Sequence, residues 1–152
     1  MPQSKFVIRK MQEQDLEAVL ELCHQLGYLN ANIELLTQNF KMGRDQLGHE
    51  FHVMIQTETQ NLVAWISLLQ RIRLQAPAYL QISALVVEEK LRGQGLGHLL
   101  LAFAEERARA AGLSLIGLMS SAPRLKAHEF YQNAGYHRTK ESFFFQKEVA
   151  CK

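Results

Sequence analysis

The chain of 152 residues has only two cysteines and three prolines. Cys23 and Cys151 are the sole pair available for a disulfide, and Cys151 is the penultimate residue, where chain ends usually fray. No CxxC, no HExxH and no paired Cys/His spacing occurs, so the sequence gives no support for a zinc site. We therefore expect a reduced protein with no structural disulfide and no bound metal.

Long apolar runs and a strong excess of one charge are also missing. No stretch reaches the roughly 18 apolar residues of a membrane helix, and the segment Met1–Lys10 lacks the apolar core of a signal peptide. Lys and Arg total 17 against 15 for Asp and Glu, and the positive charges are scattered. A general polyanion binder carries a basic stripe. We expect a soluble, cytoplasmic protein without a membrane partner and without a strong nucleic-acid signal.

The length and composition that are present are typical of one globular domain. Hydrophobic residues make up 47% of the chain and charged residues 21%. A chain of this length buries roughly 70% of the surface that its unfolded form exposes, so it needs no metal or disulfide for stability. We predict a single domain over residues 1–152, with no internal repeat and no linker.

Hydrophobic periodicity predicts an alternation of strands and helices. In the first part of the chain we expect a strand at 5–11, a helix at 16–26, a second helix at 32–43 ending near Gly43, and a hairpin of strands at 51–56 and 62–69. After a break at Gln75-Ala76-Pro77 we expect a central strand at 79–87, a helix from 96 to Gly112, a short strand at 113–119, a helix at 124–134 and a strand at 142–149 that closes the sheet. Phe143-Phe144-Phe145 is expected to pack in the core and at the edge of that sheet.

The turn Arg92-Gly93-Gln94-Gly95-Leu96-Gly97 lies between a predicted strand and a predicted helix. Backbone N–H groups and the positive end of the helix dipole favour an anion there, and glycines let the main chain approach it closely. A dinucleotide fingerprint requires glycine where His98 stands, and no GK[ST] ends the turn as in a Walker loop. A tight strand-to-helix connection without a ligand is the remaining structural interpretation.

Two segments of the chain resemble the GNAT superfamily of N-acetyltransferases. Arg92-x-x-Gly95-x-Gly97 after the central strand is similar to its acetyl-CoA pyrophosphate signature. The segment 127–136, with Phe130-Tyr131 followed by Gly135-Tyr136, is similar to its late helix. The resemblance covers nearly the whole chain. It implies an α/β (α+β mixed sheet) fold with a mostly antiparallel central sheet, splayed between the fourth and fifth strands and flanked by helices.

The resemblance implies acetyl-CoA as co-substrate. Strand main chain would pair with the pantetheine arm like an added strand, and amides of the turn would hold the pyrophosphate beside a positive charge. The cofactor-binding residues implied in this way are Leu85, Val86, Val87, Arg92, Gly93, Gln94, Gly95, Leu96, Gly97 and His98.

Two residues are candidates for proton transfer. Tyr131 matches the tyrosine that protonates the departing thiolate in many members of the superfamily, although a half-buried structural tyrosine is the alternative. Glu88, just after the central strand, is the candidate base for the amine, although carboxylates at a strand end are often simply solvated. His128 is better explained as a surface or capping residue. Because neither cysteine is suitably placed as an acyl carrier, we expect direct attack by the amine in a ternary complex.

The acceptor is expected between the segment that carries Tyr28, Leu29 and Asn30 and the C-terminal strands. It is an amine of a small molecule or of a protein, and the chain could also form a homodimer. The rival hypothesis is a non-catalytic acyl-CoA-binding regulatory module of the same fold. The two differ in whether thiol is released when acetyl-CoA and an amine are both present.

Overall fold

The structure, a computed structural model, describes residues 4–151. The chain forms two compact units, of which the first ends at Met119 and the second begins at Ser120. The predicted single domain over 1–152 stays a prediction. The elements, in chain order, are β1 (Phe6–Lys10), η1 (Glu13–Asp15), α1 (Leu16–Gln25), α2 (Ile33–Asp45), β2 (Glu50–Gln56), β3 (Leu62–Arg73), β4 (Ala76–Val87), η2 (Glu89–Leu91), α3 (Leu96–Ala110), β5 (Ile116–Leu118) and α4 (Leu125–Asn133).

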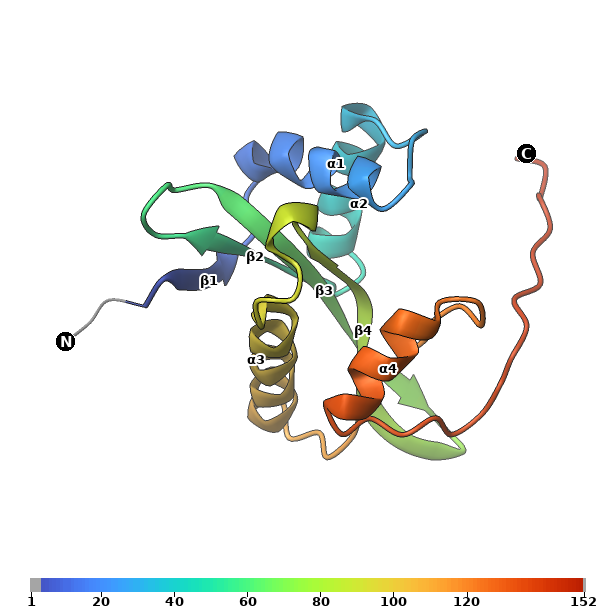
Figure 1. The fold of residues 1–152 in the computed structure, drawn as a ribbon. Coiled ribbons are helices and arrows are strands. Elements are labelled where there is room, and N and C mark those ends of the chain that lie inside the picture. The colour runs from blue at the N-terminus through green and yellow to red at the C-terminus, as the bar shows by residue number, and fades with distance from the viewer. Residues whose placement is uncertain (1–3, 152) are drawn as a thin grey trace. The chain divides into compact units, whose positions relative to one another are not determined.

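A five-stranded sheet in the order β1-β2-β3-β4-β5 forms the centre of the first unit (Figure 1). The first three strand pairs are antiparallel, whereas β4 and β5 are parallel. Parallel neighbours need a crossover connection, and α3 provides it. The predicted α/β class with a mostly antiparallel sheet is confirmed.

Helices cover both faces of this sheet, because successive side chains of a strand point to opposite faces. In β2, His52 packs edge-on against Phe103 of α3, with 4.7 Å between the ring centroids. The next residue, Val53, instead joins the core cluster with Leu16 and Val19 of α1 and Phe40 of α2. Figure 1 shows α3 on one side of the sheet and α1 and α2 on the other. Each apolar side chain fully buried between these layers contributes about 2 kcal/mol.

The helix α2 begins as predicted but runs past its expected end. The side chain of Asn32 accepts a hydrogen bond from the Leu35 N–H at 2.8 Å and caps the first turn. Gly43 does not end the helix. It lies within α2, where its lack of a side chain allows close packing against β2. A Cβ at this position would lie 2.9 Å from ring atoms of Phe51. The glycine therefore allows α2 to approach β2 and to continue to Asp45.

The break predicted at Gln75-Ala76-Pro77 is shorter than expected. Strand β3 extends to Arg73, and β4 begins at Ala76, so Pro77 lies inside the strand. The β3–β4 register is irregular between Arg71 and Arg73, opposite the start of β4. Proline is tolerated at the first residues of a strand and at bulges because a missing N–H disturbs no regular ladder there.

The strand expected at 142–149 is wrong. In the second unit α4 is followed by Gly135 at a φ of +94°, as the sequence predicts, but no helix or strand occurs from 136 to 151. Phe143, Phe144 and Phe145 are 85%, 87% and 90% exposed, so their expected core packing is also wrong. A strand forms only where another edge supplies backbone partners, and the hydrophobic pattern by itself does not provide that edge.

No helix formed by residues 4–151 has both the length and the apolar character required to cross a membrane.

A buried carboxylate joins β1 to the start of α1. Asp15, 7% exposed, accepts hydrogen bonds from Arg9 Nη1 at 2.7 Å, Arg9 Nη2 at 2.9 Å and the Gln12 N–H at 2.7 Å. Burial raises the pKa of Asp15, but these hydrogen bonds and the charge of Arg9 together outweigh burial and hold that pKa below its usual range. The ionised carboxylate is therefore favoured in the folded state.

We expect Asp15→Asn to lower the free energy of unfolding by about 2 kcal/mol, because an amide cannot accept all three hydrogen bonds. Since the folded-state pKa of Asp15 lies below its unfolded value of about 3.9, its contribution is present above that pH and is lost as the pH falls. Urea unfolding of both proteins at about pH 7 and at about pH 3, below the unfolded pKa, measures both effects. Equal unfolding free energies at neutral pH would contradict the assignment.

The buried side chain of His52 is expected to make folding stability sensitive to acid in a second way. Burial lowers its pKa, and the positive charges of Arg107 and Lys10 add to this effect against the opposing charge of Glu50. The unfolded chain therefore binds a proton at this residue more readily than the folded one, so stability falls as the pH drops below about 6.5. We expect His52→Leu to lose less unfolding free energy than the wild type between about pH 7 and pH 5. Parallel losses in the two proteins would exclude His52 as the cause.

Candidate functional site

The first feature of the site is a split between β4 and β5. Their pairing stops at Ile82 and Leu118, where β5 ends, whereas β4 continues to Val87. The last five residues of β4 therefore have no partner from β5. The splay predicted between the fourth and fifth strands is present.

Backbone alternation decides which groups face this split. The Glu88 N–H donates to the Val63 carbonyl of β3 at 2.8 Å, so 88 and 63 form a hydrogen-bonded pair. In an antiparallel ladder such pairs alternate, which places Val86 in the next hydrogen-bonded pair, with its N–H and C=O toward β3. The N–H and C=O groups of Leu85 and Val87 therefore face the edge of β4 that β5 leaves open. Main-chain pairing with a ligand was predicted for Leu85, Val86 and Val87. The register leaves Leu85 and Val87 as the candidates for it.

Beyond β4, the glycine turn leads into α3. Gly93 and Gly95 have φ of +80° and +85°, the left-handed region that favours glycine. A Cβ at either position would meet no atom within 4 Å, so packing inside the protein does not explain the small residues. Leu96, the first residue of α3, is only 2% exposed and anchors the helix start in the core. The turn is thus fixed to the sheet while its outer surface is open to a ligand.

The remaining predicted turn residues lie around this opening. The N–H groups in the first turn of α3, which include that of Gly97, have no acceptor within the helix and point toward its N-terminal end. Arg92 donates from Nε to the Val87 carbonyl at 3.2 Å and so folds back over the end of β4. Gln94 lines a shallow hollow with Lys5 and Thr57, and His98 is exposed as the third residue of α3. A glycine turn followed by a helix start is an arrangement that favours an anion.

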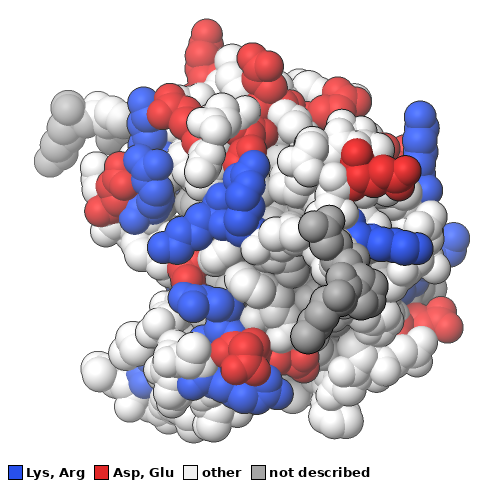
Figure 2. All heavy atoms as spheres, turned by 90° about the vertical axis from the view of Figure 1, so that its left-hand side faces the viewer, with Lys and Arg blue, Asp and Glu red and all other residues white. Residues whose placement is uncertain are grey.

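Charges of the two signs are nearly balanced over the chain. Figure 2 shows Lys and Arg together with Asp and Glu on one face of the molecule, as expected from a net charge of 17 − 15 = +2. An anionic ligand would therefore be held mainly by directed backbone N–H groups and by nearby single charges.

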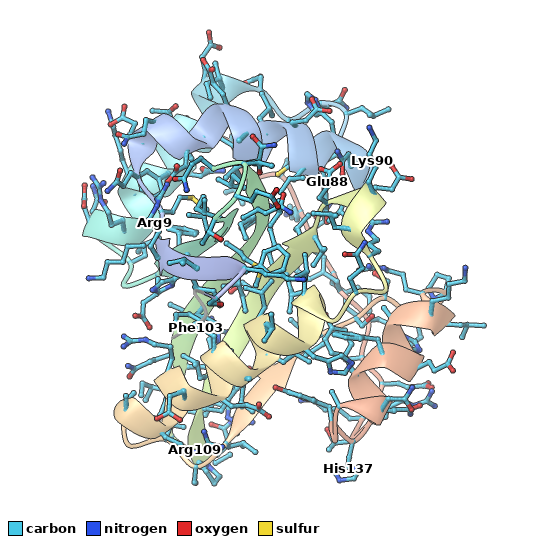
Figure 3. The ribbon with its side chains drawn as sticks, turned by 60° about the vertical axis from the view of Figure 1, so that its left-hand side comes forward. Arg9, Glu88, Lys90, Phe103, Arg109 and His137 are labelled. Carbon is cyan, nitrogen blue, oxygen red and sulfur yellow. The ribbon has the colours of Figure 1, made fainter. Side chains whose placement is uncertain are left out.

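Glu88 is held at the junction of β4 and η2. Its side chain is half-buried, and its Oε2 accepts a hydrogen bond from Nε2 of Gln25, at the end of α1, at 2.9 Å. In Figure 3 the Glu88 label lies beside this end of α1. The sequence provides no signal for the contact, because the two residues are 63 positions apart.

The α1–α2 loop, where the acceptor was expected, is an ordered turn of the first unit. His24 Nε2 is 2.9 Å from the Ala31 carbonyl, and the Tyr28 N–H donates to the Cys23 carbonyl at 3.1 Å. Tyr28 and Leu29 are 66% and 75% exposed, and Asn30 is exposed as well. These side chains are available for contact with a ligand.

Tyr131 lies in α4 of the second unit, between two other aromatic rings. Its ring centroid is 5.1 Å from that of Phe130 and 6.1 Å from that of Tyr136. Burial raises the pKa of the hydroxyl, and the positive charge of Arg124 lowers it by less. His128 contacts the Ser121 carbonyl through Nε2 at 2.8 Å. Because its pKa is raised, the Tyr131 hydroxyl keeps its proton at neutral pH.

Among residues 4–151, no group of three or more His, Cys, Asp or Glu side chains is arranged to hold a metal ion.

Comparison with known proteins agrees with this geometry. A sequence model of the Acetyltransferase (GNAT) family matches residues 16–136. The aminoalkylphosphonate N-acetyltransferase of Salmonella typhimurium is 36% identical over 109 residues, which cover 70% of this chain and 71% of that protein. Among solved structures, a transcriptional regulator from Bacillus halodurans is 23% identical with a TM-score of 0.82, and an acetyltransferase of Trypanosoma brucei is 26% identical with a TM-score of 0.78. Each alignment covers 93% of this chain and 99% of the other.

Proposed function

The chain belongs to the Acetyltransferase (GNAT) family, and from this premise we propose that it transfers an acetyl group from acetyl-CoA to a primary amine by direct attack in a ternary complex. The observation that carries this proposal is the combination of an open β4 edge with a glycine turn that leads from the same strand into the N-terminus of α3. An elongated ligand with a diphosphate that leads into an amide-containing arm matches that combination.

The described residues fit acetyl-CoA at both places. The outward N–H and C=O groups of Leu85 and the outward N–H of Val87 offer partners to the amides of the pantetheine arm, as in strand addition. The open space outside Gly93 and Gly95 lets diphosphate oxygens reach the main chain. Arg92, beside the turn, would add a positive charge. This fit supports the proposed cofactor contacts of Leu85, Val87 and the turn, but not a main-chain contact of Val86.

Two side chains would manage protons during the transfer. As the amine nitrogen bonds to the thioester carbon, the C–S bond breaks, the amine loses a proton and the leaving sulfur gains one. We assign the first proton to the Glu88 carboxylate and the second to the Tyr131 hydroxyl. The Tyr131 hydroxyl is protonated at neutral pH, as a proton donor must be, although the burial that raises its pKa makes it a weaker acid.

We propose a small amine as the acceptor and take an aminoalkylphosphonate as the first compound to test. This choice rests on the 36% identity to a protein with that named activity. The exposed Tyr28, Leu29 and Asn30 are the residues that we expect to contact the acceptor.

The test follows release of free thiol from acetyl-CoA in the presence of an aminoalkylphosphonate, an aminoglycoside, amino acids and a lysine-containing peptide. We expect amine-dependent release with at least one acceptor, and a product heavier by one acetyl group in mass spectrometry. Saturable binding of acetyl-CoA without thiol release across the panel would instead favour a non-catalytic acyl-CoA-binding module.

A further inference from the structure

The side chain of Gln25 joins the end of α1 to the segment that follows β4. Its Nε2 donates to Glu88 Oε2 at 2.9 Å, and its Oε1 accepts from the Glu89 N–H at 3.0 Å. Both contacts lie within the first unit. One amide thus uses its donor and its acceptor on two successive residues of a distant segment.

This pair of contacts defines the orientation of the amide. An N–H group can only donate, so the atom facing Glu89 must be the oxygen, and the nitrogen must then face the carboxylate. The Glu88 backbone is held independently by its hydrogen bond to Val63. The Glu88 carboxylate is therefore attached to a strand through its main chain and to a helix through Gln25, which restricts its rotamers.

We propose that Gln25 is a positioning residue that holds the Glu88 carboxylate in the orientation required to accept a proton from the acceptor amine. The inference rests on the proposed acetyltransferase function. A carboxylate on a flexible side chain spends only part of its time in the productive geometry, and a single directed donor raises that fraction. Gln25 also connects the proton acceptor to the helix whose following loop carries Tyr28 and Leu29.

Three variants distinguish two roles for Gln25. One is to orient the Glu88 carboxylate, and the other is only to link α1 to the segment that follows β4. Gln25→Glu keeps an oxygen for the Glu89 N–H but places a second negative charge against Glu88. Glu88→Gln removes the base and keeps an amide oxygen in its place. The double variant Gln25→Glu/Glu88→Gln reverses the polarity of the contact, so that the new amide at position 88 donates to the new carboxylate at position 25. It restores the attachment without restoring a base.

The experiment measures kcat, the KM for acetyl-CoA and thermal unfolding for the wild type and these variants, with an acceptor found active in the panel. Gln25→Met, which removes both hydrogen bonds without adding charge, is a second test of the single position. Gln38→Glu, the same exchange at an exposed position of α2, is the matched control. We expect kcat to fall about tenfold in both Gln25 variants and about 100-fold in Glu88→Gln, with KM for acetyl-CoA within about twofold.

The double variant gives the decisive result. We expect its unfolding temperature to return to that of the wild type while its kcat stays as low as that of Glu88→Gln. Recovery of kcat in the double variant would overturn the proposal, because attachment alone would then suffice. Wild-type kcat in Gln25→Glu or in Glu88→Gln would overturn it as well, while wild-type turnover would still support the acetyltransferase function. Absence of thiol release by the wild type would refute both.

Discussion

Gly95→Asp is expected to weaken acetyl-CoA binding by about 100-fold or more, the largest effect of any single change in the turn. The substitution puts a carboxylate where we place the diphosphate, and two like charges about 4 Å apart repel by about 4 kcal/mol at an effective dielectric constant of about 20. Its side chain would also occupy the open space outside the main chain. Isothermal calorimetry with CoA and acetyl-CoA measures the affinity directly.

The matched control is Gly112→Asp at the other end of α3. Gly112 also has a positive φ, +74°, and a Cβ there would meet no atom within 4 Å, so both variants carry the same backbone strain. The helix dipole favours a carboxylate at the N-terminal end and disfavours it at the C-terminal end, so Gly95→Asp is expected to be the more stable variant. Equal affinity for CoA in the two variants would remove the turn from the cofactor site.

Tyr131→Phe is expected to lower kcat by about 100-fold while the KM for acetyl-CoA changes by less than about twofold. The phenyl ring keeps its packing against Phe130 and Tyr136, so the variant removes only the proton donor. A positioned general acid contributes about 10²- to 10⁴-fold to a rate. Steady-state kinetics on saturating acceptor separates this loss from an effect on binding.

Tyr136→Phe, the same exchange at a neighbouring ring, is the control and is expected to keep wild-type kcat. Because burial raises the pKa of Tyr131, its proton is retained up to at least about pH 10. The wild-type rate should therefore show no alkaline decline from this group between about pH 7 and pH 9. An unchanged kcat in Tyr131→Phe would assign the tyrosine a structural role.

Local patterns in the sequence predicted most of the first unit. Side chains spaced at helical intervals, with Asn32 before one helix and Gly112 after another, placed α1, α2 and α3 within a few residues. The errors arose where a contact across the fold determined the outcome. Gly43 was interpreted as a helix end, although its small size instead leaves room for the ring of Phe51. The aromatic segment at 142–149 has a strand pattern, but no strand forms there.

The candidate site also combines features that local sequence predicts with features that depend on contacts across the fold. The glycine turn was predictable because a turn between a strand and a helix requires positive φ at fixed neighbouring positions. The β4–β5 split was expected only through the family resemblance. Its extent, and the orientation of Leu85 and Val87 toward it, depend on where β5 ends and on the register with β3.

The sequence by itself determined the glycine turn before α3 and the order of most elements, because each depends on residue types at short spacing. Only the tertiary structure decided which main-chain groups of β4 are open and that Gln25 contacts Glu88. Both depend on residues far apart in the chain, and their approach is determined by the packing of the whole first unit rather than by any local preference.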